Sequence, residues 1–291
     1  MDPLDLVKLT ALMERTSGNP EVKIGLIDGP VVTQLPDLSG EPLCEIPGNN
    51  GTTCTQANST ACLHGTFVAG ILSGKPSSPA PAICPNCALL IRPIFAEMTS
   101  GDLHVPSATA QELAAAIIEC IEAGVRVINL SLALIQPSSK DERKLEQALD
   151  HAAKRGVIIV AAAGNQGTLG STAITRHTGV IPVVAYDLQA RLMNHSNLGS
   201  SIGRRGLGAP GENVTSLGTD GKPLTFGGTS AATPFVTGAI ALLWSAFLRA
   251  TAAEVRFAVT QAYALRRATV VPPLLDAWGA YQFMTTARAR R

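Results

Sequence analysis

Short apolar runs alternate with longer amphipathic segments along the chain. Segments 110–124 and 141–156 repeat apolar residues at helical spacing, and each ends at a glycine. The apolar runs around these segments have no polar face, which is typical of strands covered on both sides. Strands are therefore predicted at 22–27, 88–95, 125–132, 157–162 and 180–185.

This alternation predicts repeated βαβ units, and hence an α/β fold of three layers. The fold is a doubly wound, mostly parallel sheet with helices on both faces. No linker divides the pattern, so a single domain is predicted over residues 1–291. Within it, 1–21 is a helical lead, 286–291 is a frayed basic tail, and 39–62 and 75–87 are loops.

Composition and charge exclude several classes of function. The formal net charge is +1 and 15% of residues are charged, so no basic surface for nucleic acid is predicted. No apolar run approaches the ~20 residues of a membrane span. The N-terminus lacks the regions of a signal peptide, and no long inhibitory pro-segment is evident. We expect a cytoplasmic protein, or a domain of a longer chain, without nucleic-acid or membrane partners.

The six cysteines leave the redox state open. Cys84 and Cys87 have CxxC spacing, which fits a local disulfide or two free thiols. Zinc is disfavoured because no second pair of ligands follows. Cys54 and Cys62 could pair across the loop between them. No metal and no cofactor are predicted.

Four polar residues fall at the ends of the predicted elements. Asp28 directly follows a strand, Asn165 follows another, and His64 opens a segment of helical periodicity. Ser230 lies where a glycine-rich turn leads into a long apolar helix, whose Pro234 is predicted to lie in the first turn. Ligands of open parallel sheets bind beyond the carboxyl ends of the strands, so the four side chains are expected at one edge.

This set of side chains fits nucleophilic catalysis. A serine hydroxyl needs a nearby base, an imidazole is the usual one, and a buried carboxylate orients the imidazole. A side-chain amide such as that of Asn165 stabilises the oxyanion that forms. Separately, the Asp, the His and the Ser have ordinary explanations as turn or helix-start residues. Their joint occurrence in the order Asp28, His64, Ser230 favours a catalytic triad.

The segments that carry these residues resemble the subtilisin-like (S8) serine proteases. They are IGLIDGPV, HGTFVAGILSG, INLSLA, VAAAGNQG and FGGTSAATPFVTGA, in the order of that family. The resemblance implies a subtilisin-like fold with Asp28 as orienting carboxylate, His64 as base, Ser230 as nucleophile and Asn165 as oxyanion donor. It also implies a substrate cleft formed by Ser131, Leu132, Ala133 and Gly164.

The sequence departs from the family at several places. Gly29 stands where a hydroxyl residue usually supports the triad carboxylate, and Phe67 and Phe235 replace histidines. Ala133 replaces a common glycine and should narrow the cleft. Segment 75–87 lacks the oxygen ligands that bind calcium in the secreted enzymes.

Within the family, the chain is most similar to the cyanobactin maturation proteases, on IDGPV, GNPEVKIG and CPNCALLIRPIF. One branch of these enzymes removes the leader of a ribosomal precursor peptide. The other removes a tail and closes the peptide into a macrocycle, using a lysine-containing helical cap inserted between the triad Asp and His. Segment 29–63 contains no lysine and has no helical periodicity.

The resulting prediction is a serine endopeptidase that hydrolyses a precursor peptide to release its leader. Three alternatives stay open. They are a general degradative subtilisin, a transamidating macrocyclase, and a catalytically silent homologue that only binds peptides.

Overall fold

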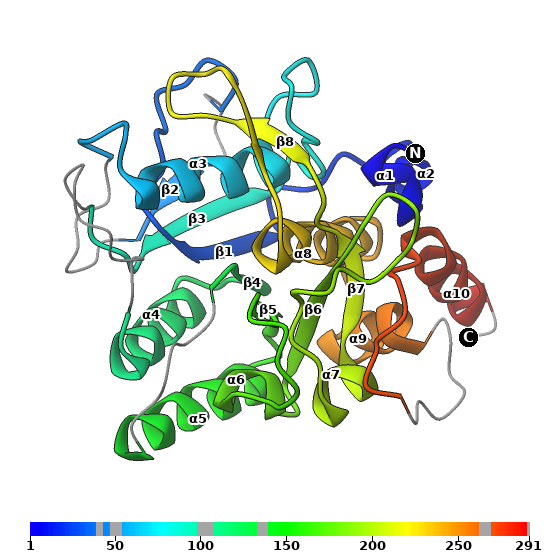
Figure 1. Cartoon of the computed structure of the whole chain (residues 1–291). Coiled ribbons are helices and arrows are strands. Elements are labelled where there is room, and N and C mark those ends of the chain that lie inside the picture. Colours follow the sequence, from blue (N-terminus) through cyan, green and yellow to red (C-terminus); the bar gives the residue numbers. More distant parts are fainter. Residues whose placement is uncertain (39–42, 47–53, 98–107, 133–138, 262–268, 290–291) are drawn as a thin grey trace.

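A seven-stranded parallel sheet lies at the centre of the structure, a computed structural model (Figure 1). The residues described are 1–38, 43–46, 54–97, 108–132, 139–261 and 269–289. Across the sheet the strands are β2 (Leu43–Glu45), β3 (Ala88–Pro93), β1 (Lys23–Asp28), β4 (Val127–Leu130), β5 (Ile158–Ala162), β6 (Val180–Tyr186) and β7 (Leu207–Pro210).

Helices cover both faces of this sheet, as the sequence predicts. Helices α4 (Ala110–Glu122) and α5 (Ser139–Lys154) lie on one face, and α3 (Thr60–Ser73) and α8 (Thr229–Ala246) lie on the other (Figure 1). The remaining elements are α1 (Pro3–Leu6), α2 (Leu9–Met13), α6 (Ala173–Arg176), α7 (Ser200–Arg205), α9 (Ala252–Gln261), α10 (Ala277–Ala289) and the hairpin β8 (Val214–Leu217) to β9 (Pro223–Phe226).

The alternation of side chains along each strand supplies both apolar cores. In β1, Ile24 and Leu26 pack in the core that contains α3 and α8, whereas Ile27 packs in the core that contains α4. All three are fully buried. Because successive strand side chains point to opposite faces, a strand between two helical layers must be apolar throughout.

Three details differ from the sequence prediction. Strand β2 lies inside segment 39–62, which was predicted to be loop, and pairs with the edge of β3. The predicted frayed tail is helical as far as Ala289, and the Arg288 guanidinium lies 4.9 Å from the centre of the Phe247 ring. The N-terminal lead is helical, but in two short pieces. No helix among the described residues is long and apolar enough to cross a membrane.

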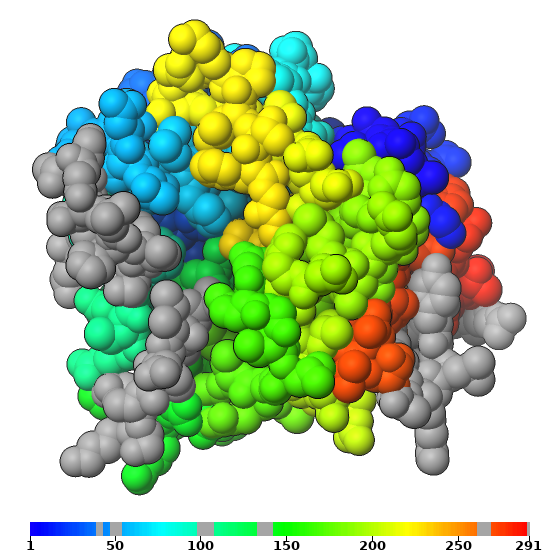
Figure 2. All heavy atoms as spheres, viewed as in Figure 1, coloured from blue at the N-terminus to red at the C-terminus, as the bar shows by residue number. Residues whose placement is uncertain are grey.

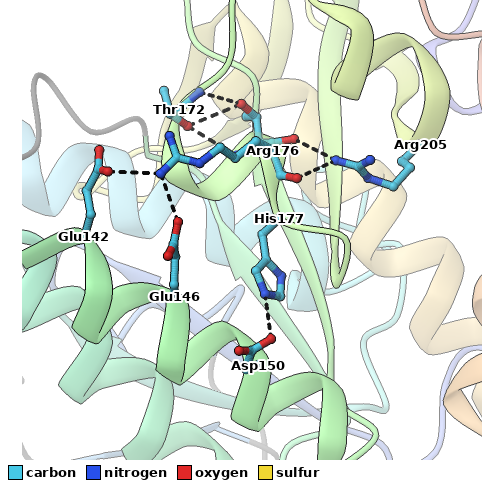
Figure 3. A network of polar contacts seen from close by, with 8 residues as sticks. Glu142, Glu146, Asp150, Thr172, Arg176, His177 and Arg205 are labelled. Carbon is cyan, nitrogen blue, oxygen red and sulfur yellow. Dashed lines mark hydrogen bonds and ion pairs between the residues drawn. The ribbon is translucent and has the colours of Figure 1, made fainter. Parts of the chain in front are cut away.

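An ion-pair network joins α5, α6 and α7 (Figure 3). Arg176 in α6 contacts Glu142 at 3.0 Å and Glu146 at 2.9 Å, both in α5. Arg205 in α7 donates to the Arg176 carbonyl oxygen at 2.8 Å. Exposed ion pairs each contribute little to stability, so the network links these helices without adding much to the free energy of folding. Helices α5 and α6 follow β4 and β5, whose ends carry predicted site residues.

Candidate active site

Three neighbouring strands end at the same edge of the sheet. Ile27 of β1 pairs with Leu130 of β4, and Leu130 pairs with Ala161 of β5. Asp28 ends β1 directly, and Ser131 follows β4 directly. The structure therefore brings the predicted residues at these strand ends to one edge, as expected for an open parallel sheet.

His64 reaches this edge from the first turns of α3. Its Nδ1 lies 2.7 Å from Oδ1 of Asp28, which is fully buried, while the His64 side chain is 27% exposed. An ionised carboxylate only accepts hydrogen bonds, so Nδ1 carries the proton and Nε2 of the neutral ring is left as a base. The predicted Asp28–His64 pair is present in the structure.

Two opposing effects set the pKa of His64. Burial lowers it, but the Asp28 carboxylate and its hydrogen bond raise it by more, so the pKa lies above the ordinary value of 6.5. The ring is therefore a stronger base than a free histidine. For the same reason it is already protonated, and unable to act as a base, at a higher pH than a free histidine.

The acid limb of the activity profile should accordingly have its midpoint above pH 6.5. His64 accepts a proton only when it is neutral, so activity falls as the pH drops through its raised pKa. The measurement is the second-order rate of labelling by a fluorophosphonate probe across the acid and neutral range. A midpoint below pH 6.5 would contradict the raised pKa of His64.

The two carboxylate oxygens of Asp28 differ in their hydrogen bonds. Oδ1 accepts from the Gly29 N–H at 2.7 Å as well as from His64, whereas Oδ2 has no hydrogen-bond partner among the described residues. Gly29 is the position where the family usually supplies a hydroxyl. A Cβ on Gly29 would lie 2.0 Å from the carbonyl oxygen of Ala61 in α3. The close approach of α3 to β1 therefore excludes any side chain here.

Restoring the family's residue by Gly29→Ser should destabilise the protein, even though it offers a hydroxyl to Asp28. The added Cβ overlaps a backbone carbonyl, and such overpacking costs roughly 1–3 kcal/mol or more. Urea unfolding of Gly29→Ser and Gly29→Ala measures this cost, and both variants should be destabilised. A serine variant as stable as the native protein would show that α3 adjusts freely.

Ser230 is the second residue of α8 and is half-buried. Gly228 precedes the helix with φ +93°, and a Cβ there would lie 2.9 Å from Oδ1 of Asn165. Phe226, four residues before Ser230, stacks on the His64 ring with 6.4 Å between ring centres. These contacts hold the start of α8 beside both α3 and the segment after β5. In the space-filling view, these parts of the chain meet around a hollow on one face (Figure 2).

The Asn165 amide is oriented by Thr229, the residue before Ser230. Its Oδ1 accepts from the Thr229 N–H at 2.8 Å and from the Thr229 hydroxyl at 3.0 Å. Because both partners are donors to Oδ1, the amide nitrogen Nδ2 is turned away from Thr229 with its hydrogens available. Asn165 is exposed, so its Nδ2 is accessible to a bound group.

Three of the four predicted cleft residues lie in the described part of the chain. Ser131 and Leu132 follow β4 at the site edge, and both are buried. Gly164 is also buried: its N–H donates to the Thr229 hydroxyl at 3.2 Å, and its carbonyl accepts from the Asn197 N–H at 2.9 Å. Its contact with a peptide stays a prediction. Ala133 lies outside the described residues.

Three residues that contact site residues were not predicted from the sequence: Phe226 stacks on His64, Thr229 donates to Asn165, and Asn129 donates to the Ser131 hydroxyl at 2.8 Å. Phe226 is an isolated aromatic in a turn-like segment, and nothing in the sequence marks its contact with His64. Asn129 did carry a signal, since it is a polar residue within an otherwise apolar strand. Buried polar side chains need partners, so such a residue indicates a hydrogen-bond network.

The cysteines separate into two groups. Cys54 and Cys62 form a disulfide that ties the loop before α3 to the first turn of the helix, two residues from His64. Glu97 lies beside this pair, but the joined sulfurs are not free thiolates, so these three residues do not form a metal site. Cys84 and Cys87 are free, buried thiols rather than a disulfide, and Cys87 contacts the Ser245 hydroxyl.

Comparison with known proteins identifies the family of the chain. The profile of the Subtilase family (peptidase S8) matches residues 19–276. The chain belongs to this family. A subtilase relative, the thermophilic serine proteinase of Bacillus sp. (strain AK1), is 32% identical over 234 residues, which cover 79% of this chain and 54% of that protein. The chain thus spans about half the length of that relative.

Solved subtilase structures also resemble the fold over nearly its whole length. A mutant of the protease domain of PatA is 29% identical, with a TM-score of 0.81 over 93% of this chain and 97% of that one. The prenylagaramide maturation protease PagA is 26% identical, with a TM-score of 0.82 over 96% and 98%. The resemblance to cyanobactin maturation proteases that the sequence indicates is therefore confirmed at the level of structure.

Proposed function

We propose that the chain is a serine endopeptidase whose nucleophile is Ser230. The observation that carries this proposal is the 2.7 Å contact of His64 with the buried Asp28, at the edge where Ser230 opens α8. The Asn165 amide, oriented by Thr229, adds a donor beside the nucleophile. Together these groups supply a base, its orienting carboxylate, a hydroxyl and an oxyanion donor.

The reaction then proceeds in two stages. The Ser230 oxygen attacks the peptide carbonyl carbon while Nε2 of His64 takes the hydroxyl proton, and Asn165 donates to the oxyanion that forms. The protonated ring next gives its proton to the leaving amine, so the C–N bond breaks and an ester on Ser230 remains. Water attacks this ester with His64 again as the base, which releases the acid and restores the serine.

The proposed substrate is a ribosomally made precursor peptide, cut in the cytoplasm to release its leader. The support is the resemblance to PatA and PagA, the second of which is a maturation protease by name. A general degradative role has separate support, since the relative from Bacillus sp. (strain AK1) is by name a serine proteinase.

Hydrolysis is proposed over macrocyclisation because little described structure stands between Asp28 and His64. The two residues are 36 positions apart, and the only regular element described between β1 and α3 is the three-residue β2. A macrocyclase must shield its acyl-enzyme from water and hold the peptide amine close to the ester. A site without such a shield admits water to the ester.

Mass spectrometry of the products from a candidate precursor peptide tests this function. We expect a linear core peptide together with the intact leader, and slow or no cleavage of an unrelated denatured protein. A core lighter by one water would indicate cyclisation, and equal cleavage of the denatured protein would indicate a degradative enzyme. Binding without turnover, with no fluorophosphonate labelling, would indicate a silent homologue.

A further inference from the structure

Pro234 lies inside α8, not in its first turn as the sequence analysis predicts. The helix begins at Thr229, so Pro234 is its sixth residue. Proline has no N–H, and in an α-helix that N–H would donate to the carbonyl four residues earlier. The carbonyl that loses this donor belongs to Ser230, the proposed nucleophile.

A side chain from another element supplies a donor to that carbonyl. The Ser131 hydroxyl, just beyond the end of β4, donates to the Ser230 carbonyl oxygen at 3.0 Å. Ser131 is 3% exposed, so water does not compete freely for this bond. A bond from the sheet thus takes the place of a bond within the helix, at the first turn of α8.

Ser131 is itself held by a chain of buried hydrogen bonds. The Thr237 hydroxyl donates to Oδ1 of Asn129 at 2.8 Å, and Nδ2 of Asn129 donates to Oγ of Ser131 at 2.8 Å. Asn129 and Thr237 are fully buried. All three bonds run in one direction, from Thr237 in α8 through β4 and back to Ser230 in α8. Successive bonds of this kind strengthen one another.

We propose that Ser131 is a positioning residue. Its hydroxyl bonds to the backbone of the nucleophile Ser230 and so replaces the helix hydrogen bond that Pro234 removes. This inference rests on the proposed function of Ser230. Ser131 also begins the segment predicted to pair with the substrate backbone. The bound peptide and the nucleophile are therefore both positioned by Ser131. The Ser131 hydroxyl contacts the nucleophile's backbone, so its loss should affect the chemical step rather than substrate binding.

The first test is Ser131→Ala, which removes the hydroxyl and keeps the backbone that pairs with substrate. Small displacements of a reacting group cost up to about 10²-fold in rate, so we expect kcat and the fluorophosphonate labelling rate to fall roughly 10- to 100-fold with KM little changed. Ser245→Ala is the matched control, because the Ser245 hydroxyl also donates to a carbonyl of α8, far from the site. The control should label at the native rate.

The second test is rescue by Pro234→Ala, which returns an N–H to α8 four residues after Ser230. Adding Ser131→Ala to this variant should cost less than about threefold, because the helix now supplies the donor, and such non-additivity measures the coupling. A loss of overall stability alone would not produce this rescue. Melting temperatures of all the variants, measured in parallel, identify any that fail to fold.

Two results would overturn the inference: native labelling by Ser131→Ala, or the same loss in both Pro234 backgrounds. Labelling requires only the nucleophile and its base, so it reports on positioning whether or not a precursor peptide is the substrate. If the fluorophosphonate probe labels the native protein but the protein does not process the precursor, the proposed substrate is contradicted and the positioning role of Ser131 stands. A native protein that does not label would overturn both.

Discussion

Ser230→Ala should abolish labelling by a fluorophosphonate probe and reduce kcat by roughly 10⁶-fold, the size known for the nucleophile of subtilisin. The probe needs a hydroxyl whose proton is taken by an adjacent base. Among the described residues His64 is the histidine paired with a buried carboxylate, and Ser230 opens the helix held beside it. Removing one oxygen atom leaves α8 and its packing intact, so the melting temperature should change little.

Ser200→Ala is the matched control for this variant. Ser200 is an exposed serine at the start of α7, so its loss tests whether any accessible serine at a helix start reacts. The control should label at the native rate. Labelling that persists in Ser230→Ala would assign the reaction to another serine and remove the basis of the proposed function.

Those parts of the fold that follow from local periodicity could be predicted from the sequence. Strands β1, β3, β4, β5 and β6 fall within the predicted segments or a residue or two beyond them, because a strand buried on both faces leaves a continuous apolar run. Strands β2, β7, β8 and β9 were not predicted and have only three or four residues each. Strand β4 is equally short, but it lies inside the continuous apolar run 125–132, whereas these four lie in segments with no such run and are defined by pairing with a neighbouring strand.

Contacts between distant elements could not be predicted. The sequence places Gly29 after Asp28, but only the packing of α3 shows that a serine cannot be accommodated there. Pro234 was assigned to the first turn because proline is tolerated there, yet the helix starts earlier and the Ser131 hydroxyl compensates for the missing donor. Tertiary hydrogen bonding here overrides a local rule.

Substitution of Asn165 is the second change expected to have a large effect on kcat. Two donors from Thr229 hold Oδ1, and in the proposed mechanism Nδ2 donates to the substrate oxygen beside Ser230. Charge develops on the substrate oxygen only as the tetrahedral intermediate forms, so a fixed donor stabilises that state more than the bound substrate. The bond to Thr229 also means that the amide is oriented before substrate arrives.

Asn165→Ala should therefore lower kcat by roughly 10²–10³-fold with little change in KM. Asn165→Asp is the sharper variant, because it keeps an oxygen acceptor for Thr229 and replaces the donor with a second acceptor that repels the oxyanion. We expect Asn165→Asp to be at least as impaired as Asn165→Ala while unfolding at a similar temperature. Steady-state kinetics on one peptide substrate measure both. A fall in kcat below about tenfold in either variant, or a loss confined to KM, would show that Nδ2 does not reach the developing charge, since a transition-state donor acts on kcat.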